Sequence, residues 1–242
     1  MSVTSSFYPS QTPAPSVQQQ PSLNEYLSEL VSKRTATLKY LRRAHEGNTH
    51  WFNTILLTRN DLCSLYPNPR MQRRTCNFYT LGSSLGSLLE INSSPDYVKA
   101  LNQLLNEFDY YNSDHSSKQK MKNIFRKARG KDDNHYTEGG EYTYLTVPHV
   151  PFELDYFETF FTLTDIMTEA YQKLLVGFEI CTQPYFELVL KCDGKLKKIF
   201  SQITKELDGL ARDAIKEELM IIDPLSQSNK ISPIDFETVE DV

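Results

Sequence analysis

The feature that most constrains the fold is a seam of mostly apolar residues between Pro184 and Pro224. Its members recur at alternating spacings of four and three, the heptad period of one helix packed against another. Two acids, Asp193 and Glu217, interrupt the seam, and polar residues at such positions often fix register or partner number. The pattern predicts one continuous helix, on the order of 50 Å long, with a coiled-coil-like seam. The seam residues are Val189, Asp193, Leu196, Phe200, Ile203, Leu207, Leu210, Ala214, Glu217 and Ile221.

A second long helix is expected near the N-terminus. Ser22 and Glu25 have the spacing of a capping box, in which the two side chains bond to backbone N–H groups at a helix start. Apolar residues then recur at helical spacing as far as Pro67. Gly47 loosens the middle of this stretch, at a cost of about 1 kcal/mol relative to Ala. We therefore expect one helix from Ser22 to Pro67, on the order of 60 Å long if it is unbroken.

Three further segments, residues 71–91, 95–112 and 152–178, have apolar residues at helical spacing and predict shorter helices. The last of them is rich in aromatic residues and is apolar around much of its circumference, so we expect it at the centre of the fold. Gly82 and Gly86 lie one turn apart in the first segment, where missing side chains would let another helix approach closely.

Together these segments predict an all-α fold, an antiparallel helical bundle of about five helices with long N- and C-terminal helices. The bundle domain spans residues 22–225 and contains one long basic inserted loop, residues 113–150, where the helical spacing fails. Residues 1–21 carry no charge and are rich in Pro, Ser and Gln, whereas residues 226–242 hold four acids and one Lys. Such compositions bury too little apolar surface to offset the entropy of ordering. Both ends are therefore predicted to be disordered, as an uncharged arm and an acidic tail.

The overall charge limits the classes of partner. Against 26 Lys and Arg the chain has 31 Asp and Glu, a net charge of -5, which argues against a DNA-binding domain because phosphate contacts need a surplus of basic residues. No run approaches the roughly 20 apolar residues that span a bilayer. The four cysteines, Cys63, Cys76, Cys181 and Cys192, match neither a metal knuckle nor a disulfide framework. We expect reduced thiols and a cytoplasmic protein, with the nucleus and the periphery of membranes as alternatives.

The strongest charge feature is the basic segment, residues 117–131, which holds seven basic residues and no acid. On a helix, Met121, Ile124, Phe125 and Ala128 would form an apolar stripe beside a basic face. This pattern is typical of an interfacial membrane helix or of a helix that binds in a partner's groove, and the alternative is a solvated basic loop. The predicted partner or membrane surface combines this segment with lysines of the last helix: Lys118, Lys120, Lys122, Ile124, Phe125, Arg126, Lys127, Arg129, Lys131, Lys195, Lys197 and Lys198.

Sequence signatures of catalysis and metal binding are missing. A zinc-protease helix needs two His four residues apart, whereas His45 and His50 lie five apart, about 140° around a helix. We interpret both as polar histidines on the surface or between helices. No Glu is followed three residues later by His, as a di-iron bundle site requires. The phosphate-loop, dinucleotide and nucleophile-elbow motifs are also missing, so we predict no cofactor, no metal and no catalytic residue.

Two functional hypotheses follow. The first is a non-enzymatic intracellular adaptor or scaffold that acts through helix–helix contacts with protein partners or with a second copy of the chain. The second is a peripheral protein that binds anionic membranes through the basic segment. Long heptad helices with basic patches are also the general plan of membrane-curving BAR-type dimers, although no residue motif assigns the chain to that family. A third hypothesis is an enzyme of unrecognised type, because the aromatic residues 152–161, beside Tyr142, Tyr144 and His149, would line a pocket.

Overall fold

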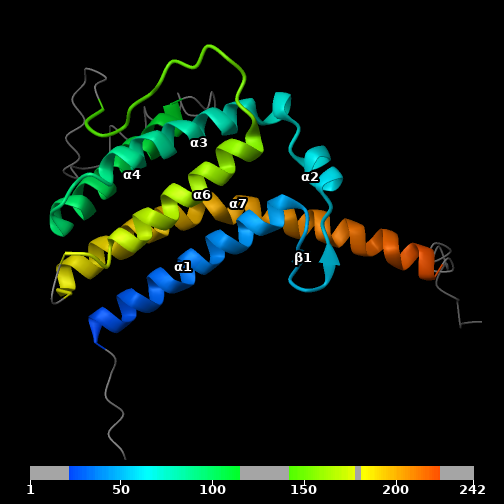
Figure 1. Cartoon of the computed structure of the whole chain (residues 1–242), viewed down its shortest axis with the longest axis horizontal. Coiled ribbons are helices and arrows are strands. Elements are labelled where there is room, and N and C mark those ends of the chain that lie inside the picture. Colours follow the sequence, from blue (N-terminus) through cyan, green and yellow to red (C-terminus); the bar gives the residue numbers. More distant parts are fainter. Residues whose placement is uncertain (1–21, 115–141, 178–180, 224–242) are drawn as a thin grey trace, which may run out of the picture.

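The structure is a computed structural model that describes residues 22–114, 142–177 and 181–223 (Figure 1). Helices dominate this part of the chain, and its one sheet has only two strands, which confirms the all-α prediction. The predicted arm, the acidic tail and most of the inserted loop lie outside the described residues. The elements are α1 (Leu23–Glu46), β1 (His50–Trp51), β2 (Ile55–Leu56), α2 (Arg59–Leu65), α3 (Asn68–Leu88), α4 (Ser94–Asp114), α6 (Tyr156–Lys173) and α7 (Gln183–Ile222).

The first helix is shorter than the sequence predicts. It starts at the expected capping box, in which the Glu25 N–H donates to Ser22 Oγ at 3.3 Å and the Ser22 N–H donates to Glu25 Oε2 at 2.7 Å. It ends before Gly47, whose φ of 79° lies in the left-handed region. A Cβ at this glycine would lie 2.5 Å from the backbone nitrogen of Arg59. The prediction of helix throughout residues 48–66 is therefore wrong, because this stretch forms the β1–β2 hairpin and the short helix α2.

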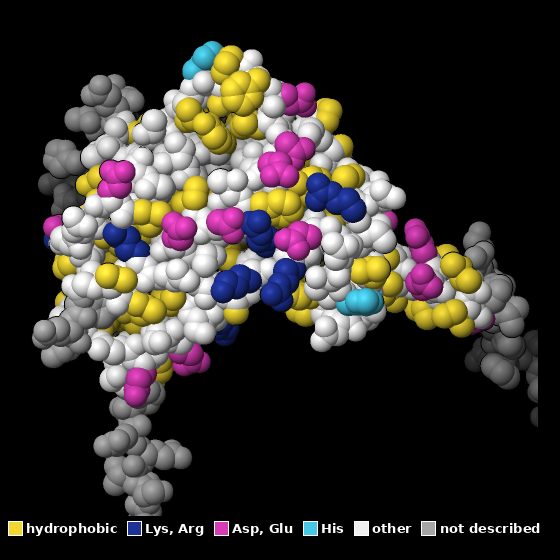
Figure 2. Space-filling view, viewed as in Figure 1, with side chains coloured by type: hydrophobic (Ala, Val, Ile, Leu, Met, Phe, Trp, Pro, Cys, Tyr) yellow, Lys and Arg dark blue, Asp and Glu magenta, His cyan; other side chains and the backbone are white. Residues whose placement is uncertain are grey.

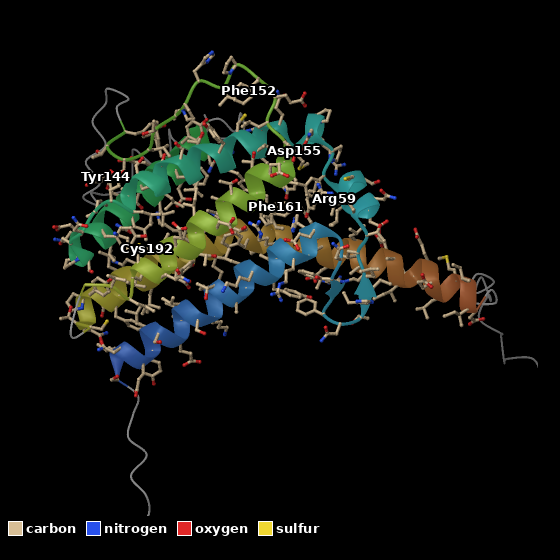
Figure 3. All side chains as sticks on the ribbon, viewed as in Figure 1. Arg59, Tyr144, Phe152, Asp155, Phe161 and Cys192 are labelled. Atoms are coloured by element: carbon tan, nitrogen blue, oxygen red, sulfur yellow. The ribbon has the colours of Figure 1, made fainter. Side chains whose placement is uncertain are left out.

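Helix α6 lies between α1 and α3 and packs against both (Figure 1), as its apolar circumference predicted. It begins four residues later than expected because Asp155 caps it, accepting the N–H groups of Phe157 at 2.9 Å and Glu158 at 3.0 Å (Figure 3). Asn68, the first residue of α3, donates to the Asp155 carboxylate and accepts the N–H of Tyr156, both at 3.0 Å. These bonds join the starts of α3 and α6.

The two glycines of α3 differ in what they face. A Cβ at Gly82 would meet Leu163 at 3.6 Å and Ile166 at 3.7 Å, so this glycine lies against α6 as predicted. A Cβ at Gly86 would meet no described atom within 4 Å. The expected close approach of a helix at Gly86 is therefore wrong.

One buried carboxylate anchors the described part of the inserted loop to α4. Glu107 is 1% exposed and accepts the backbone N–H groups of Thr143 at 3.0 Å, Tyr144 at 2.9 Å and Leu145 at 2.8 Å. Burial alone raises the pKa of Glu107, but these bonds and one from Gln103 outweigh it and hold the pKa below its ordinary value. Three backbone hydrogen bonds to the Glu107 carboxylate therefore fix residues 143–145 of the loop against α4.

The long C-terminal helix is confirmed, since α7 runs for 40 residues. Its seam is buried at six of the positions from Val189 to Leu207, and Ala211 beyond them is buried too. Over this stretch α7 packs on α4 and also contacts α1 and the hairpin. Beyond Ala211 it projects from the rest of the molecule (Figure 1), and none of its remaining residues is buried. We call residues 212–222 the α7 end.

Candidate functional site

The three lysines predicted as one surface on the last helix face different neighbours. Lys195 lies against α4, with its Nζ 3.1 Å from the Asp109 carboxylate. Lys198 is exposed. Lys197 lies beside α1, where it lines a pocket. The other predicted surface residues belong to the basic segment, residues 117–131, which lies outside the described residues.

The pocket beside Lys197 has a volume of about 310 Å³ and lies between α1 and α7, so we call it the α1/α7 pocket. Its apolar base consists of Leu38 and Phe200, which are buried, with the buried Tyr171 of α6. The described residues that line it are Arg34, Thr37, Leu38, Tyr171, Lys197, Phe200, Ser201, Thr204 and Lys205.

A partly buried ion pair lies at one end of the α1/α7 pocket, where Arg34 lines it. Arg34 Nε and Nη2 donate to the two carboxylate oxygens of Asp193 at 2.6 Å and 2.8 Å, which is a bidentate geometry. The Tyr171 hydroxyl donates to the same carboxylate at 2.9 Å. The hydrogen bonds that Arg34 donates to Asp193 raise the pKa of Arg34. Burial raises the pKa of Tyr171, and the Asp193 charge adds to that effect. The arginine is therefore charged and the phenol neutral at physiological pH.

Sequence reasoning found Asp193 but missed its partner. Arg34 interrupts the apolar spacing of the first helix, just as Asp193 interrupts that of the last. Opposite charges that interrupt two apolar stripes are a signal for a buried pair, because each would need a counter-charge when its stripe is covered. The two residues are 159 positions apart, and the sequence does not say which helices are neighbours, so the pair could not be predicted.

The β1–β2 hairpin stands near the other end of the α1/α7 pocket. Trp51, the only tryptophan of the chain, donates its Nε1–H to the Asp208 carboxylate at 2.7 Å. Its ring stacks on Tyr40 of α1, with the ring centroids 5.3 Å apart. Asp208 lies about one helical turn beyond Lys205 on α7, so the hairpin contacts this helix next to the part that lines the pocket.

The charges around the α1/α7 pocket are one-sided. Three cations and no carboxylate are among the described residues that line it. Lys197 and Lys205 make no ion pair with any residue that the structure describes. The hydroxyls of Thr37 and Thr204 donate to carbonyls of their own helices at 2.8 Å and 3.1 Å, which leaves them as acceptors. Lys197 and Lys205, both exposed, are therefore the uncompensated cations of the pocket lining.

The outer face next to α1 has a different character. Figure 2 shows basic side chains along α1 with acidic side chains beside them. Arg42 illustrates the arrangement, since it donates to the Asp165 carboxylate of α6 at 2.6 Å and lies 3.6 Å from Glu46. Arg42 is thus compensated by acidic neighbours, unlike Lys197 and Lys205 of the pocket.

The aromatic start of α6 belongs to the core. Tyr156 and Phe160 are fully buried, and the His45 ring lies 4.2 Å from that of Phe160 and 5.4 Å from that of Tyr66. Burial lowers the pKa of His45 to about 4, against the effect of a backbone hydrogen bond, so this imidazole is neutral at physiological pH. His45 thus lies between helices and His50 is exposed.

A second pocket, of about 370 Å³, lies where α3, α4 and α7 meet. Asn112 near the end of α4 lines it, and the basic segment begins five residues further along the chain. Glu206 of α7 receives a bidentate pair of hydrogen bonds from Arg74 at 2.7 Å and 2.8 Å. Burial raises the pKa of Glu206, but these bonds outweigh it and hold the pKa below its ordinary value. The arginines of this pocket are Arg70, Arg73 and Arg74.

The described residues contain no group of three or more His, Cys, Asp or Glu that could hold a metal ion. Among the same residues, no helix has the length and apolar character needed to cross a bilayer. All four cysteines are free, and burial raises the pKa of Cys192 to about 12, so this thiol is not a nucleophile at neutral pH.

Comparison of the chain with protein-family models, with curated proteins and with solved structures found no match.

Proposed function

We propose that the chain is a non-enzymatic adaptor whose helical bundle associates with a second copy of itself through the α7 end. The observation that supports this proposal is a run of exposed apolar residues on the α7 end, which projects from the rest of the molecule (Figure 1). Leu219 is 56% exposed, Met220 47%, Ile221 75% and Ile222 76%. Exposed apolar residues grouped in this way mark interaction sites. Figure 2 shows apolar side chains at this end of the molecule with acidic side chains beside them.

The order of charges in the α7 end favours a second copy as the occupant. Arg212 and Lys216, with Asp213 between them, come before Glu217 and Glu218 in the α7 end, and Asp223 follows directly after it, so a part with a net charge of +1 precedes a wholly acidic part. When two such helices run antiparallel, the basic part of each lies beside the acidic part of the other, as charged flanking positions do in coiled coils. The heptad spacing that α7 uses inside its own chain would then continue as a seam between two copies.

Light scattering combined with small-angle X-ray scattering on the full chain tests this proposal. We expect a mass that rises with concentration towards that of a dimer, with an elongated shape. The double substitution Ile221→Asp with Ile222→Asp is expected to give a monomer at every concentration, because it places four charges into the seam of the dimer. The matched control is Phe152→Asp, at an apolar residue that is 66% exposed on the segment before α6 (Figure 3), and it is expected to leave the dimer intact. A chain that remains monomeric up to about 100 times a micromolar dissociation constant, or a dimer that survives the Ile substitutions, contradicts the proposal.

Peripheral membrane binding is the second candidate function, and the arginine-lined pocket favours it. Arg73 is exposed in that pocket. Helix α4, whose Asn112 lines the same pocket, ends three residues before the basic segment in the sequence. A surface of anionic lipids would gain about 1 kcal/mol per basic residue near it. The two basic groups together could therefore hold the chain at such a surface.

Sedimentation with vesicles of phosphatidylcholine, with and without phosphatidylserine, tests the membrane candidate. Binding should require phosphatidylserine and should weaken as salt rises from about 100 to about 500 mM. The triple substitution Lys122→Glu, Arg126→Glu and Lys127→Glu is expected to abolish it. The control reverses charge at Lys39 of α1 and Lys99 of α4, which are exposed and lie outside the predicted membrane surface, and it should retain binding. Sedimentation that does not depend on the anionic lipid contradicts this candidate.

A further inference from the structure

We propose that the α1/α7 pocket binds an anionic amphiphile, a small molecule with one carboxylate or phosphate head on an apolar chain. The proposal goes beyond self-association and membrane binding, because it concerns a soluble ligand bound in the pocket between α1 and α7. It rests on the size of the pocket, on its apolar base and on the two lysines that face it.

The size and base of the pocket suit an apolar chain of limited length. Its 310 Å³ lies at the lower end of the range of about 300–1,000 Å³ typical of ligand sites. At about 30 Å³ for a water-sized group, it holds on the order of ten such groups. Leu38, Phe200 and the ring of Tyr171 supply an apolar base, which favours methylene groups over polar ones.

The charges of the pocket select an anion. Asp193 already accepts two bonds from Arg34 and one from Tyr171, so its charge is compensated and it does not compete for the lysines. A ligand that brings a negative head into the pocket meets no carboxylate among the described lining residues. A cationic or neutral head would leave the ammonium groups of Lys197 and Lys205 without a counter-charge.

The head group belongs at the end of the pocket that is nearer to Arg34. Lys197 stands there, one turn after Asp193 on α7, and its charge adds to an ion pair that is already neutral overall. At the opposite end, Lys205 stands one turn before Asp208, whose carboxylate offsets it in part. The two lysines are eight positions apart in the sequence, which corresponds to about 12 Å along the helix. The chain of the ligand would run across Leu38 and Phe200 in this interval.

Titration of the full chain with four soluble probes tests the proposal, with the fluorescence of Trp51 and calorimetry as readouts. The probes are decanoate, decyl phosphate, decanol and inorganic phosphate, each kept below the concentration at which it forms micelles. We expect saturable binding of one molecule per chain for decanoate, decyl phosphate or both, and the stronger of the two identifies the head group. Decanol and inorganic phosphate should bind at least about tenfold more weakly, since decanol lacks the anionic head and inorganic phosphate lacks the apolar chain. Equal binding of decanol, or no saturation with either anionic probe, overturns the proposal.

Charge reversals locate the head group. Lys197→Glu is expected to weaken the binding of the anionic probe by about tenfold or more, and Lys205→Glu by a smaller factor. Lys198→Glu makes the same charge change at the neighbouring exposed residue, which does not line the pocket, and should weaken binding less than about twofold. Equal effects of Lys197→Glu and Lys198→Glu would mean a general attraction to positive charge and would overturn the proposal.

A steric variant tests the pocket without changing its charge. Ser201 is exposed on α7 and lines the pocket, so Ser201→Trp fills the space with little effect on the core. We expect this variant to keep its helical circular dichroism and to lose binding of the anionic probe. Unchanged binding would place the probe elsewhere and overturn the proposal. The Ile221→Asp, Ile222→Asp variant should bind the probe like the wild type, which separates this inference from the proposed self-association.

Discussion

The two parts of α7 share one apolar period but have opposite environments. From Val189 to Ala211 the helix is covered by α4, α1 and the hairpin. In the α7 end the same kind of apolar side chain is exposed, as Ile221 and Ile222 show. The acid that interrupts each part follows the same division, since Asp193 is buried and paired whereas Glu217 is exposed.

A heptad period therefore indicates that an apolar stripe is to be covered by another helix, but it does not indicate whether that helix belongs to the same chain or to a second one. The covered part of α7 packs against helices of its own chain. Asp193, the acid that interrupts this part, is buried and forms an ion pair with Arg34. The α7 end has the same kind of apolar stripe and no cover among the described residues. Substitutions at equivalent residues of the two parts therefore test the comparison directly.

The largest expected difference in unfolding free energy is between substitutions of Asp193 and of Glu217, the two acids that interrupt the apolar seam. Asp193→Ala leaves the Arg34 guanidinium partly buried without its counter-charge and Tyr171 without its acceptor, and breaking such a pair costs about 3–5 kcal/mol of unfolding free energy. Glu217→Ala should change it by less than about 0.5 kcal/mol. Urea unfolding followed by circular dichroism measures both. Similar midpoints for the two variants would break the comparison.

The next difference concerns leucines. Leu207 is fully buried and Leu219 is 56% exposed, so Leu207→Ala should cost about 2–5 kcal/mol through lost burial and a cavity. Leu219→Ala should cost less than about 0.5 kcal/mol under dilute conditions where the chain is monomeric. Chemical unfolding at two protein concentrations distinguishes packing of Leu219 within its own chain from packing against a second copy. A large effect of Leu219→Ala at low concentration would show that the α7 end packs within its own chain.

A smaller difference is expected for two aspartates. Asp208→Ala removes the acceptor of the buried Trp51 indole and should cost about 1–3 kcal/mol, with a change in tryptophan fluorescence. Asp213 of the α7 end pairs with Lys216 at 3.2 Å, but both side chains are exposed, so Asp213→Ala should cost at most about 0.5 kcal/mol. Thermal unfolding with fluorescence detection measures both. Unchanged fluorescence in Asp208→Ala would contradict the role of this bond in fixing the hairpin.

The smallest expected effect is on the way in which the contribution of Glu206 to folding stability depends on pH. The pKa of Glu206 is lowered in the folded state, chiefly because the bonds from Arg74 outweigh the effect of burial. A lowered folded pKa contributes stability above the unfolded value of about 4.3, and this is lost as the pH falls through the folded pKa. The advantage of the wild type over Glu206→Gln should therefore shrink as the pH drops from about 6 to about 3. A constant difference for Glu206→Gln would contradict the assignment.

Much of the fold could be predicted because its signals are local. The capping box at Ser22, the length of α7 and the amphipathic segments of α3, α4 and α6 depend on residues within a few turns of one another. The candidate site was predicted only in part. Lys197 was named, but Lys205 and the pocket itself were missed, because the pocket exists only where three helices from distant parts of the chain meet.

By itself, the sequence determined that the chain is helical, where the capping box starts α1, and that α7 is one long apolar-striped helix, because hydrogen bonding and periodicity over a few residues decide these properties. Only the tertiary structure decided that the first helix stops before Gly47, since the obstacle to a side chain there is the backbone of Arg59. It also decided which part of α7 is covered and that Asp193 meets Arg34. These outcomes depend on contacts between residues far apart in the chain, and no local pattern encodes which distant helix becomes the neighbour.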